Sequence, residues 1–141
     1  MIIPPLNYLW ETDTAVVTSY AKENENYRYF LLVVNAFSKY VWTIPLKSTK
    51  GIEIASALSS VLDGNSKLWH LRTDRDSELK NKLVSRLLKE MGVKHFFSSN
   101  KKKSCFAERA IKSKLSRYMS CHQRHRWIDV LKSDTDSYNG T

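Results

Sequence analysis

The sequence lacks the features that mark secreted, membrane-spanning or repetitive proteins. Its 141 residues include only two cysteines, Cys105 and Cys121, which excludes a disulfide framework and favours a reducing compartment. No apolar run approaches the roughly 20 residues that span a membrane, and residues 1–5 show no signal-peptide pattern. Internal repeats and low-complexity tracts are also missing. A chain of this length with 42% hydrophobic residues is expected to form one domain with a substantial core.

Acidic residues are scarce in one segment, and the excess positive charge of the chain lies there. Residues 101–126 contain nine lysines and arginines but one acid, Glu108, a net charge of +8, whereas the whole chain carries +9. A local excess of this kind indicates a surface that binds a polyanion, and nucleic acid fits best. An ordinary solvated helix face is the alternative.

Hydrophobic periodicity predicts five strands and four helices. After a lead-in segment of residues 1–8, strands are expected over residues 9–17, 27–34, 40–46, 67–73 and 93–97. Helices are expected over residues 50–62, 77–91, 104–119 and 127–138. Short links between the first three strands indicate an antiparallel meander. The later strands alternate with helices and are expected to join the same sheet. The prediction is an α/β fold with a mixed five-stranded sheet flanked by helices.

Local signals set the expected ends and buried faces of the later helices. Ser104 is a plausible N-cap, and Gly92 is a natural residue with which to end the second helix. The apolar stripe of that helix is expected to comprise Leu79, Leu83, Val84, Leu87, Leu88 and Met91. The last helix has a poor pattern, because Asp134 and Thr135 fall where apolar residues would help.

Three carboxylates stand where the predicted elements would bring them together. Asp13 lies within the first strand, where propensity disfavours a carboxylate, and Asp74 directly follows the apolar fourth strand. Glu108 lies three and seven positions before Ile111 and Leu115, so it falls on the stripe of the third helix that should face the sheet. Surface charge, helix capping and an ion pair with Arg109 or Lys112 are the plainer roles for these side chains.

Carboxylates that converge at one end of a sheet repel each other unless a cation joins them. Oxygen ligands alone favour Mg²⁺ or Mn²⁺ over zinc. Two such ions can activate a water or a DNA 3′-hydroxyl and stabilise the leaving oxygen of a phosphodiester. The neighbouring basic segment would hold the phosphate backbone. We therefore expect Asp13, Asp74 and Glu108 to bind metal and act in catalysis.

At these residues the sequence resembles the catalytic core of retroviral-type integrases of the DDE superfamily. The likeness is nearest to the integrases of Polinton/Maverick transposons and of long-terminal-repeat elements. It rests on the order and spacing of residues 10–13, 27–40, 44–47, 72–75, 92–96, 102–109, 126–131 and 136–139. The resemblance implies a ribonuclease H-like fold over residues 9–141, with Asp13, Asp74 and Glu108 as the metal-binding triad. The 33 residues between Asp74 and Glu108 (75 to 107) fit the family's usual spacing.

The resemblance further implies a metal-dependent polynucleotidyl transferase. Such an enzyme processes the 3′ ends of element DNA and transfers them into target DNA, with two Mg²⁺ or Mn²⁺ ions. It would act as a homodimer or higher multimer, in the nucleus where the element is eukaryotic. The expected DNA contacts, chiefly to phosphate, are Lys101, Lys102, Lys103, Arg109, Lys112 and Lys114. A nuclease of the same fold and a domesticated, inactive DNA-binding or interaction module remain alternatives.

The sequence departs from the family pattern at several positions. Asp76 stands where the family has glycine, and Asn35 where an aspartate is common. Glu-Arg-Ala-Ile-Lys at residues 108–112 replaces the frequent Glu-Arg-Phe-Asn-Arg, so Ile111 takes the place of an asparagine. The family's amino-terminal zinc domain and its carboxy-terminal domain have no counterpart in these 141 residues. We therefore expect a fragment, an isolated core or a degenerate copy.

Other side chains have mostly structural interpretations. Trp10, Trp42, Trp69 and Trp127 are expected in the core or at an interface. His95 lies in a strand and is expected to be structural or to contact DNA. The stretch Cys-His-Gln-Arg-His at residues 121–125 lacks a second cysteine pair at ligand spacing, so a zinc site is not expected there.

Overall fold

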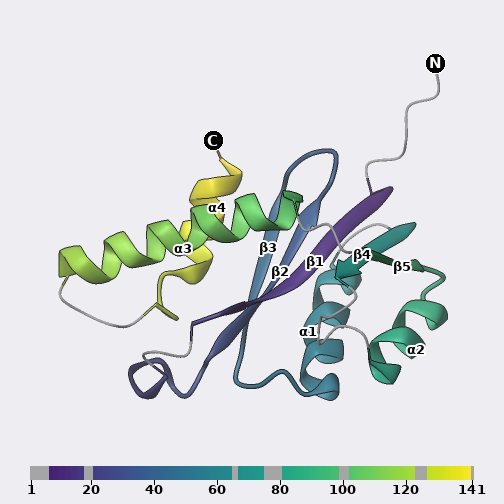
Figure 1. The fold of residues 1–141 in the computed structure, drawn as a ribbon, viewed down its shortest axis with the longest axis horizontal. Helices are drawn as coiled ribbons and strands as arrows, with labels where there is room; N and C mark the ends of the chain where they lie inside the picture. The colour runs from purple at the N-terminus through teal and green to yellow at the C-terminus, as the bar shows by residue number, and fades with distance from the viewer. Residues whose placement is uncertain are drawn as a thin grey trace.

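The computed structural model describes residues 7–17, 21–64, 67–74, 81–98, 102–122 and 127–140, some of them, including Asp74 and residues 102–107, without their side chains. Within these ranges five strands form one sheet: β1 Leu9–Val16, β2 Tyr29–Asn35, β3 Val41–Leu46, β4 His70–Asp74 and β5 Lys94–Ser98. Their order across the sheet is β3-β2-β1-β4-β5 (Figure 1). The predicted mixed five-stranded sheet is confirmed.

The first three strands form the predicted meander, and the last two are added in parallel. β2 is antiparallel to both β1 and β3, whereas β4 is parallel to both β1 and β5. Asn35 closes the β2–β3 turn, because its Oδ1 accepts hydrogen bonds from the backbone N–H groups of Phe37 at 2.9 Å and Ser38 at 3.2 Å. A side chain that bonds its own turn in this way holds the reversal of the chain.

Helices α1 (Gly51–Asp63) and α2 (Lys82–Glu90) cover one face of the sheet (Figure 1). Alternate strand residues point to this face, and Trp10, Leu31 and Leu71 are among those fully buried there. They pack against Ile54 and Leu58 of α1. We call this side the α1/α2 face.

Helices α3 (Lys102–His122) and α4 (Leu131–Asn139) cover the opposite face over β1, β2 and β3. The other set of alternate residues, such as Phe30 and Leu32, packs there against Ile111 and Leu115 of α3. Ile111 and Leu115 are 0% and 1% exposed, which confirms the predicted buried stripe of α3. We call this side the α3/α4 face.

A short 3-10 helix, η2 (Lys22–Asn24), anchors the chain before α4. The fully buried Asn24 accepts hydrogen bonds at its Oδ1 from the backbone N–H groups of Trp127 at 2.7 Å and Ile128 at 3.0 Å. Trp127 in turn is 1% exposed and lies 6.4 Å from the ring of Phe30. The link therefore ties the carboxy-terminal segment to the core.

Three predicted helix starts are wrong, and local capping explains that of α2. α3 begins at Lys102, so Ser104 lies inside the helix and is not its N-cap. α2 begins at Lys82, because Asn81 is an extended N-cap whose Oδ1 accepts a hydrogen bond from Val84 N–H at 2.9 Å. The expected earlier turn, residues 77–80, lies outside the described residues.

The last helix begins at Leu131, because residues 128–130 form a turn rather than the predicted start of the helix. Thr135, at a position where the helical pattern favours an apolar residue, is nonetheless buried. The Thr135 hydroxyl donates to the Leu131 carbonyl at 2.8 Å and lies 2.7 Å from the hydroxyl of Thr43 on β3. A polar side chain is tolerated here because its hydrogen bonds are satisfied.

Leu83, expected on the buried stripe of α2, is exposed instead, and Trp69, expected in the core or at an interface, lies at the surface. Leu83 is 41% exposed, because the buried side of α2 is centred on Val84 and Leu88. Trp69 is 49% exposed, whereas Trp10 and Trp127 are buried. In the part of the chain that is described, no helix is both long and apolar enough to cross a membrane.

Candidate active site

Asp13 lies in the middle of β1, on the α3/α4 face. It pairs across β2 with Leu32, a core residue of that face. The Asp13 side chain is half-buried, and its Oδ1 accepts a hydrogen bond from the backbone N–H of Thr14 at 2.8 Å. This contact orients the carboxylate from its own strand.

Asp74 is the last residue of β4, and the strand register places it next to Asp13. β1 and β4 run parallel, and their recorded pairs end at Thr12 with Thr73. The next position on each strand is Asp13 and Asp74, and laterally paired residues share a face of the sheet. The backbone therefore brings positions 13 and 74, two of the three predicted ligands, next to each other in the sheet. The Asp74 side chain itself lies outside the described atoms.

Glu108 faces the same side from α3. It lies one and two turns before the buried Ile111 and Leu115, so it continues their stripe toward the start of the helix. The side chain is 30% exposed, and Oε1 lies 4.0 Å from Nζ of Lys112. An ion pair between Glu108 and Lys112 was the plainer role considered for Glu108, and the structure contains it at the longest distance of a salt bridge. An exposed pair of this kind contributes little to stability. It is compatible with metal binding.

The residue types fit a hard divalent cation, since the three predicted ligands on β1, β4 and α3 are carboxylates and offer only oxygen donors. Among the side chains that are described, no group of three His, Cys, Asp or Glu could hold a metal ion. Asp74 is not among those side chains, so the triad of Asp13, Asp74 and Glu108 stays a prediction.

An ion pair beside the carboxylates was not predicted from the sequence. Arg72 Nη1 donates to Glu11 Oε1 at 2.8 Å, and these residues pair across β1 and β4. Glu11 is 7% exposed, whereas the Arg72 side chain is 39% exposed. The signal available in the sequence was their spacing: each precedes a predicted ligand, Asp13 or Asp74, by two residues. A step of two keeps them on the same face as those ligands.

The predicted DNA-contact residues occupy different surroundings. Arg109 is exposed, Lys112 lies beside Glu108, and Lys114 reaches α4, where its Nζ is 3.4 Å from Ser137 Oγ. Lys102 and Lys103 lie in the first turn of α3 without described side chains, and Lys101 lies outside the described residues. No zinc site was expected at residues 121–125, and the side chains of these residues are also not described.

Lys114 also affects a carboxylate of α4. Burial raises the pKa of Asp134 above its ordinary value, and the nearby positive charge of Lys114 offsets part of that rise. Asp134 Oδ2 is buried and has no hydrogen-bond partner among the described atoms. Lys114 therefore serves the packing of α3 on α4 as well as the positive surface.

His95 is turned away from the carboxylates. It pairs laterally with Leu71, which is buried on the α1/α2 face. Its Nε2 lies 2.9 Å from the hydroxyl of Thr73, and its ring centroid lies 4.3 Å from that of Phe97. Burial lowers the pKa of His95. Of the two predicted roles, structure or DNA contact, the position supports the structural one.

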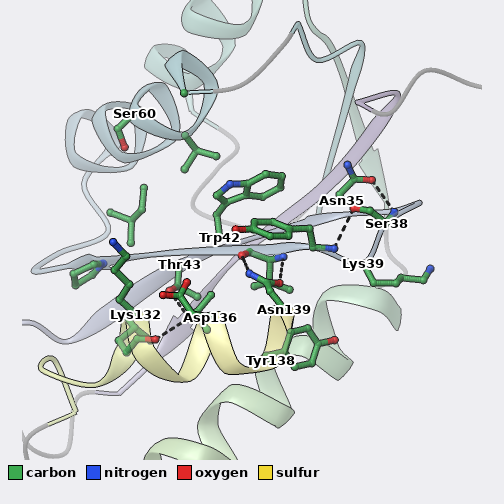
Figure 2. A pocket seen from close by; sticks show the side chains of 18 of the residues that line it. Asn35, Ser38, Lys39, Trp42, Thr43, Ser60, Lys132, Asp136, Tyr138 and Asn139 are labelled. Atoms are coloured by element: carbon green, nitrogen blue, oxygen red, sulfur yellow. Dashed lines mark hydrogen bonds between the residues drawn. The ribbon is translucent and has the colours of Figure 1, made fainter. Parts of the chain in front are cut away.

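A groove of about 1180 Å³ runs along β3, between α1 and α4, away from the carboxylates (Figure 2). At its floor the Asn139 side chain pairs with the outer edge of β3. Its Oδ1 accepts from Val41 N–H at 2.7 Å, and its Nδ2 donates to the Val41 carbonyl at 2.7 Å. These two bonds imitate a neighbouring strand and cover one position of an otherwise open edge.

Comparison with known families identifies one match. The family model described as "Integrase core domain" matches residues 6–103. A transposon-derived protein of Caenorhabditis elegans is 28% identical over 130 residues, which are 89% of this chain and 45% of that protein. The chain thus spans less than half the length of this relative.

Solved structures of viral integrases share the fold. An intasome of simian T-cell lymphotropic virus, in complex with the PP2A regulatory subunit B56 gamma, matches with a TM-score of 0.76 and 19% identity, over 96% of this chain and 50% of the viral chain. The catalytic core domain of BIV integrase matches with a TM-score of 0.72 and 15% identity, over 93% and 82% of the two chains. These likenesses confirm the predicted ribonuclease H-like fold.

Proposed function

Because this chain belongs to the integrase core domain family, we propose that it is a metal-dependent polynucleotidyl transferase that inserts the ends of element DNA into target DNA. The observation that carries the proposal is the β1–β4 register: its last pair is Thr12 with Thr73, and Asp13 and Asp74 are the next residues on the two parallel strands. Glu108 completes the set from the helix packed over the same face. The activity of the whole protein belongs to the same proposal.

The three carboxylates would hold one or two Mg²⁺ or Mn²⁺ ions between β1, β4 and α3. When bound, these ions would lower the pKa of the attacking hydroxyl and offset the charge on the phosphate. The protein supplies the positions of its ligands. β1 and β4 are joined by ladder hydrogen bonds and by the Glu11–Arg72 pair, so Asp13 and Asp74 sit on a rigid support.

The chemistry needs two successive displacements at phosphorus. Water would first attack at the element end and release a strand with a free 3′-hydroxyl. That hydroxyl would then attack a phosphodiester of the target, so that one bond forms as another breaks and no covalent protein–DNA intermediate arises. No side chain is required as general base, because the carboxylates act through the cations they hold.

The positive surface of α3 would attract the DNA backbone. Arg109 and Lys112 flank Glu108 on the helix, and the segment of residues 101–126 carries a net charge of +8. Lysines reach phosphate as flexible point charges and read little sequence. Target choice would then depend mainly on DNA shape, and binding would weaken as salt rises.

Two further features complete the proposal. The chain would act as a multimer, by analogy with the structural relative solved in a viral intasome, and in the nucleus if its element is eukaryotic. An inactive DNA-binding module is the second candidate. It is favoured by Ile111, which is fully buried where the family pattern has asparagine, so this position offers no polar contact to DNA.

A strand-transfer assay with end-labelled element DNA and a supercoiled target separates these functions. We expect Asp74→Asn to abolish joined products while leaving DNA binding and its salt dependence nearly unchanged. Glu90→Gln, on the exposed side of α2, is the matched control and should retain transfer. Joined products from Asp74→Asn would overturn the metal mechanism.

The same assay tests the alternatives by its products. Cut ends without joined strands would identify a nuclease. If the wild-type chain forms neither product, calorimetric titration with Mn²⁺ decides: binding that Asp13→Asn removes supports a metal site, and no binding supports the inactive module.

A further inference from the structure

Part of the α3/α4 face is not covered by a described helix. α3 lies over β1 and β2 and α4 over β3, and Figure 1 shows both helices displaced from β4 and β5. The residues that the register assigns to this part are exposed. Phe96 of β5 is 44% exposed, the paired Arg72 side chain is 39% exposed, and Lys94 is exposed beside His70.

A row of aromatic rings begins on this open part and continues past the start of β4. Phe96 stacks on His70 with ring centroids 5.3 Å apart and planes 20° apart. His70 lies 4.6 Å from Tyr8, which lies 5.9 Å from Trp69. We call Phe96, His70, Tyr8 and Trp69 the aromatic row. The two ends of the row, Phe96 and Trp69, are 44% and 49% exposed. Trp69 lies two residues before Leu71, so strand alternation assigns it to the α1/α2 face, whereas Phe96 and His70 lie on the open part. Exposed rings in contact with one another mark binding surfaces more often than isolated apolar residues do.

The row begins next to the proposed metal ligands. Phe96 pairs with Arg72, which lies two residues before Asp74 along β4, about 7 Å at the rise of a strand. His70 lies four residues before Asp74, or about 13 Å. A strand of DNA whose reacting phosphate sits at the carboxylates would therefore meet Phe96 and then His70 if it followed β4.

The charge of the row suits a polyanion. Arg72 and Lys94 flank Phe96 and His70 with exposed positive groups. The acid that pairs with Arg72 is Glu11, which is only 7% exposed and so presents little negative charge to a ligand. Surfaces that bind single strands combine cations, which contact the phosphates, with aromatic rings, which stack on the bases.

We propose that the aromatic row is a stacking platform for unpaired nucleotides at the end of the DNA that enters the site. The inference rests on the proposed function for its substrate. A duplex hides the flat faces of its bases, whereas a single strand exposes them, and every base has such a face. The platform would therefore favour a frayed or overhanging end over a blunt one, without reading its sequence.

Two adjacent phenylalanines provide a matched test. Phe96 lies on the α3/α4 face, and Phe97, 39% exposed, lies on the opposite one beside His95. Fluorescence anisotropy would measure binding of the chain to a blunt duplex and to the same duplex with an overhang of about five nucleotides, with EDTA present. We expect Phe96→Leu to weaken overhang binding about tenfold and leave blunt binding unchanged. Phe97→Leu should change neither, and Phe96→Tyr should restore overhang binding.

Other outcomes would overturn the platform. Equal losses on both DNAs would indicate a general effect on the charged surface, and no loss would exclude stacking on Phe96. A lower oligomeric mass of Phe96→Leu by light scattering, with unchanged DNA binding, would assign the row to a protein contact. Because the assay contains no metal, its result is independent of strand transfer. A chain that joins no strands but shows the Phe96 effect would keep the platform and lose the proposed enzyme.

Discussion

Glu11 and Arg72 form an ion pair across β1 and β4, with Oε1 and Nη1 2.8 Å apart, two residues before Asp13 and Asp74 respectively. The pair lies on the same face as the predicted ligands. It therefore supports the spacing of the two strands that carry them. Only the carboxylate end is buried, since Glu11 is 7% and the Arg72 side chain 39% exposed.

Removing Arg72 should destabilise the fold because it leaves the Glu11 carboxylate buried without its cation. The loss of unfolding free energy would be larger if both partners were fully buried. Because the Arg72 side chain is partly exposed, we expect Arg72→Leu to lower the unfolding free energy by only about 1–2 kcal/mol. Urea unfolding measures the change. In the double variant Glu11→Gln/Arg72→Leu, which has no buried carboxylate at position 11, the loss of unfolding free energy should largely disappear. Additive losses from the two single changes would contradict the coupling.

Asn35→Asp, which restores the residue common in the family, should also destabilise this chain. The Asn35 amide is buried and donates from Nδ2 to Asn7 Oδ1 at 3.4 Å, while its own Oδ1 accepts from two turn N–H groups. An aspartate keeps the acceptor but brings a second oxygen against Asn7. The expected cost is about 1–3 kcal/mol, measured by chemical denaturation. Asn35→Ser would separate the loss of the donor from the added charge, and an unchanged stability of Asn35→Asp would show that Asn7 reorients.

Asn139→Ala should open the edge of β3. The change removes both hydrogen bonds to Val41, and unsatisfied backbone groups at a sheet edge favour pairing with another chain. We expect a loss of about 1–2 kcal/mol in unfolding free energy and faster growth of light scattering on warming. Ser137→Ala, exposed on the same helix, is the control. Equal behaviour of the two variants would remove the edge-covering role of Asn139.

The half-buried His95 predicts a loss of stability in mild acid. Burial lowers the pKa of His95 in the folded protein below its ordinary value of 6.5. The unfolded chain therefore takes up the proton at a higher pH than the folded one. Stability should fall as the pH drops below about 6.5, until the folded-state pKa is passed. Thermal midpoints of the wild type and of His95→Gln at pH 7.5 and 5.5 measure this, and a smaller acid shift is expected for the variant. Equal shifts would assign the acid sensitivity to other groups.

The sequence by itself determined the elements and the pattern of the sheet. Alternating and continuous apolar runs encode strands locally, so residues 9–16, 29–35 and 41–46 could be recognised without knowledge of their neighbours. The periodic stripe of α3 likewise identified Ile111 and Leu115 as buried and Glu108 as facing the sheet. These signals depend only on the repeat of each element and on its need to bury one side.

Tertiary structure decided what distant residues do together. The register of β1 against β4 sets Asp13 beside Asp74 and joins Glu11 to Arg72, and no local rule contains that register. Asn24 and Asn139 acquire their partners about a hundred residues away in the sequence. Trp69, for which a core or an interface position was predicted, is 49% exposed where it precedes β4. Such contacts and exposures are decided only when the packed sheet brings the segments together.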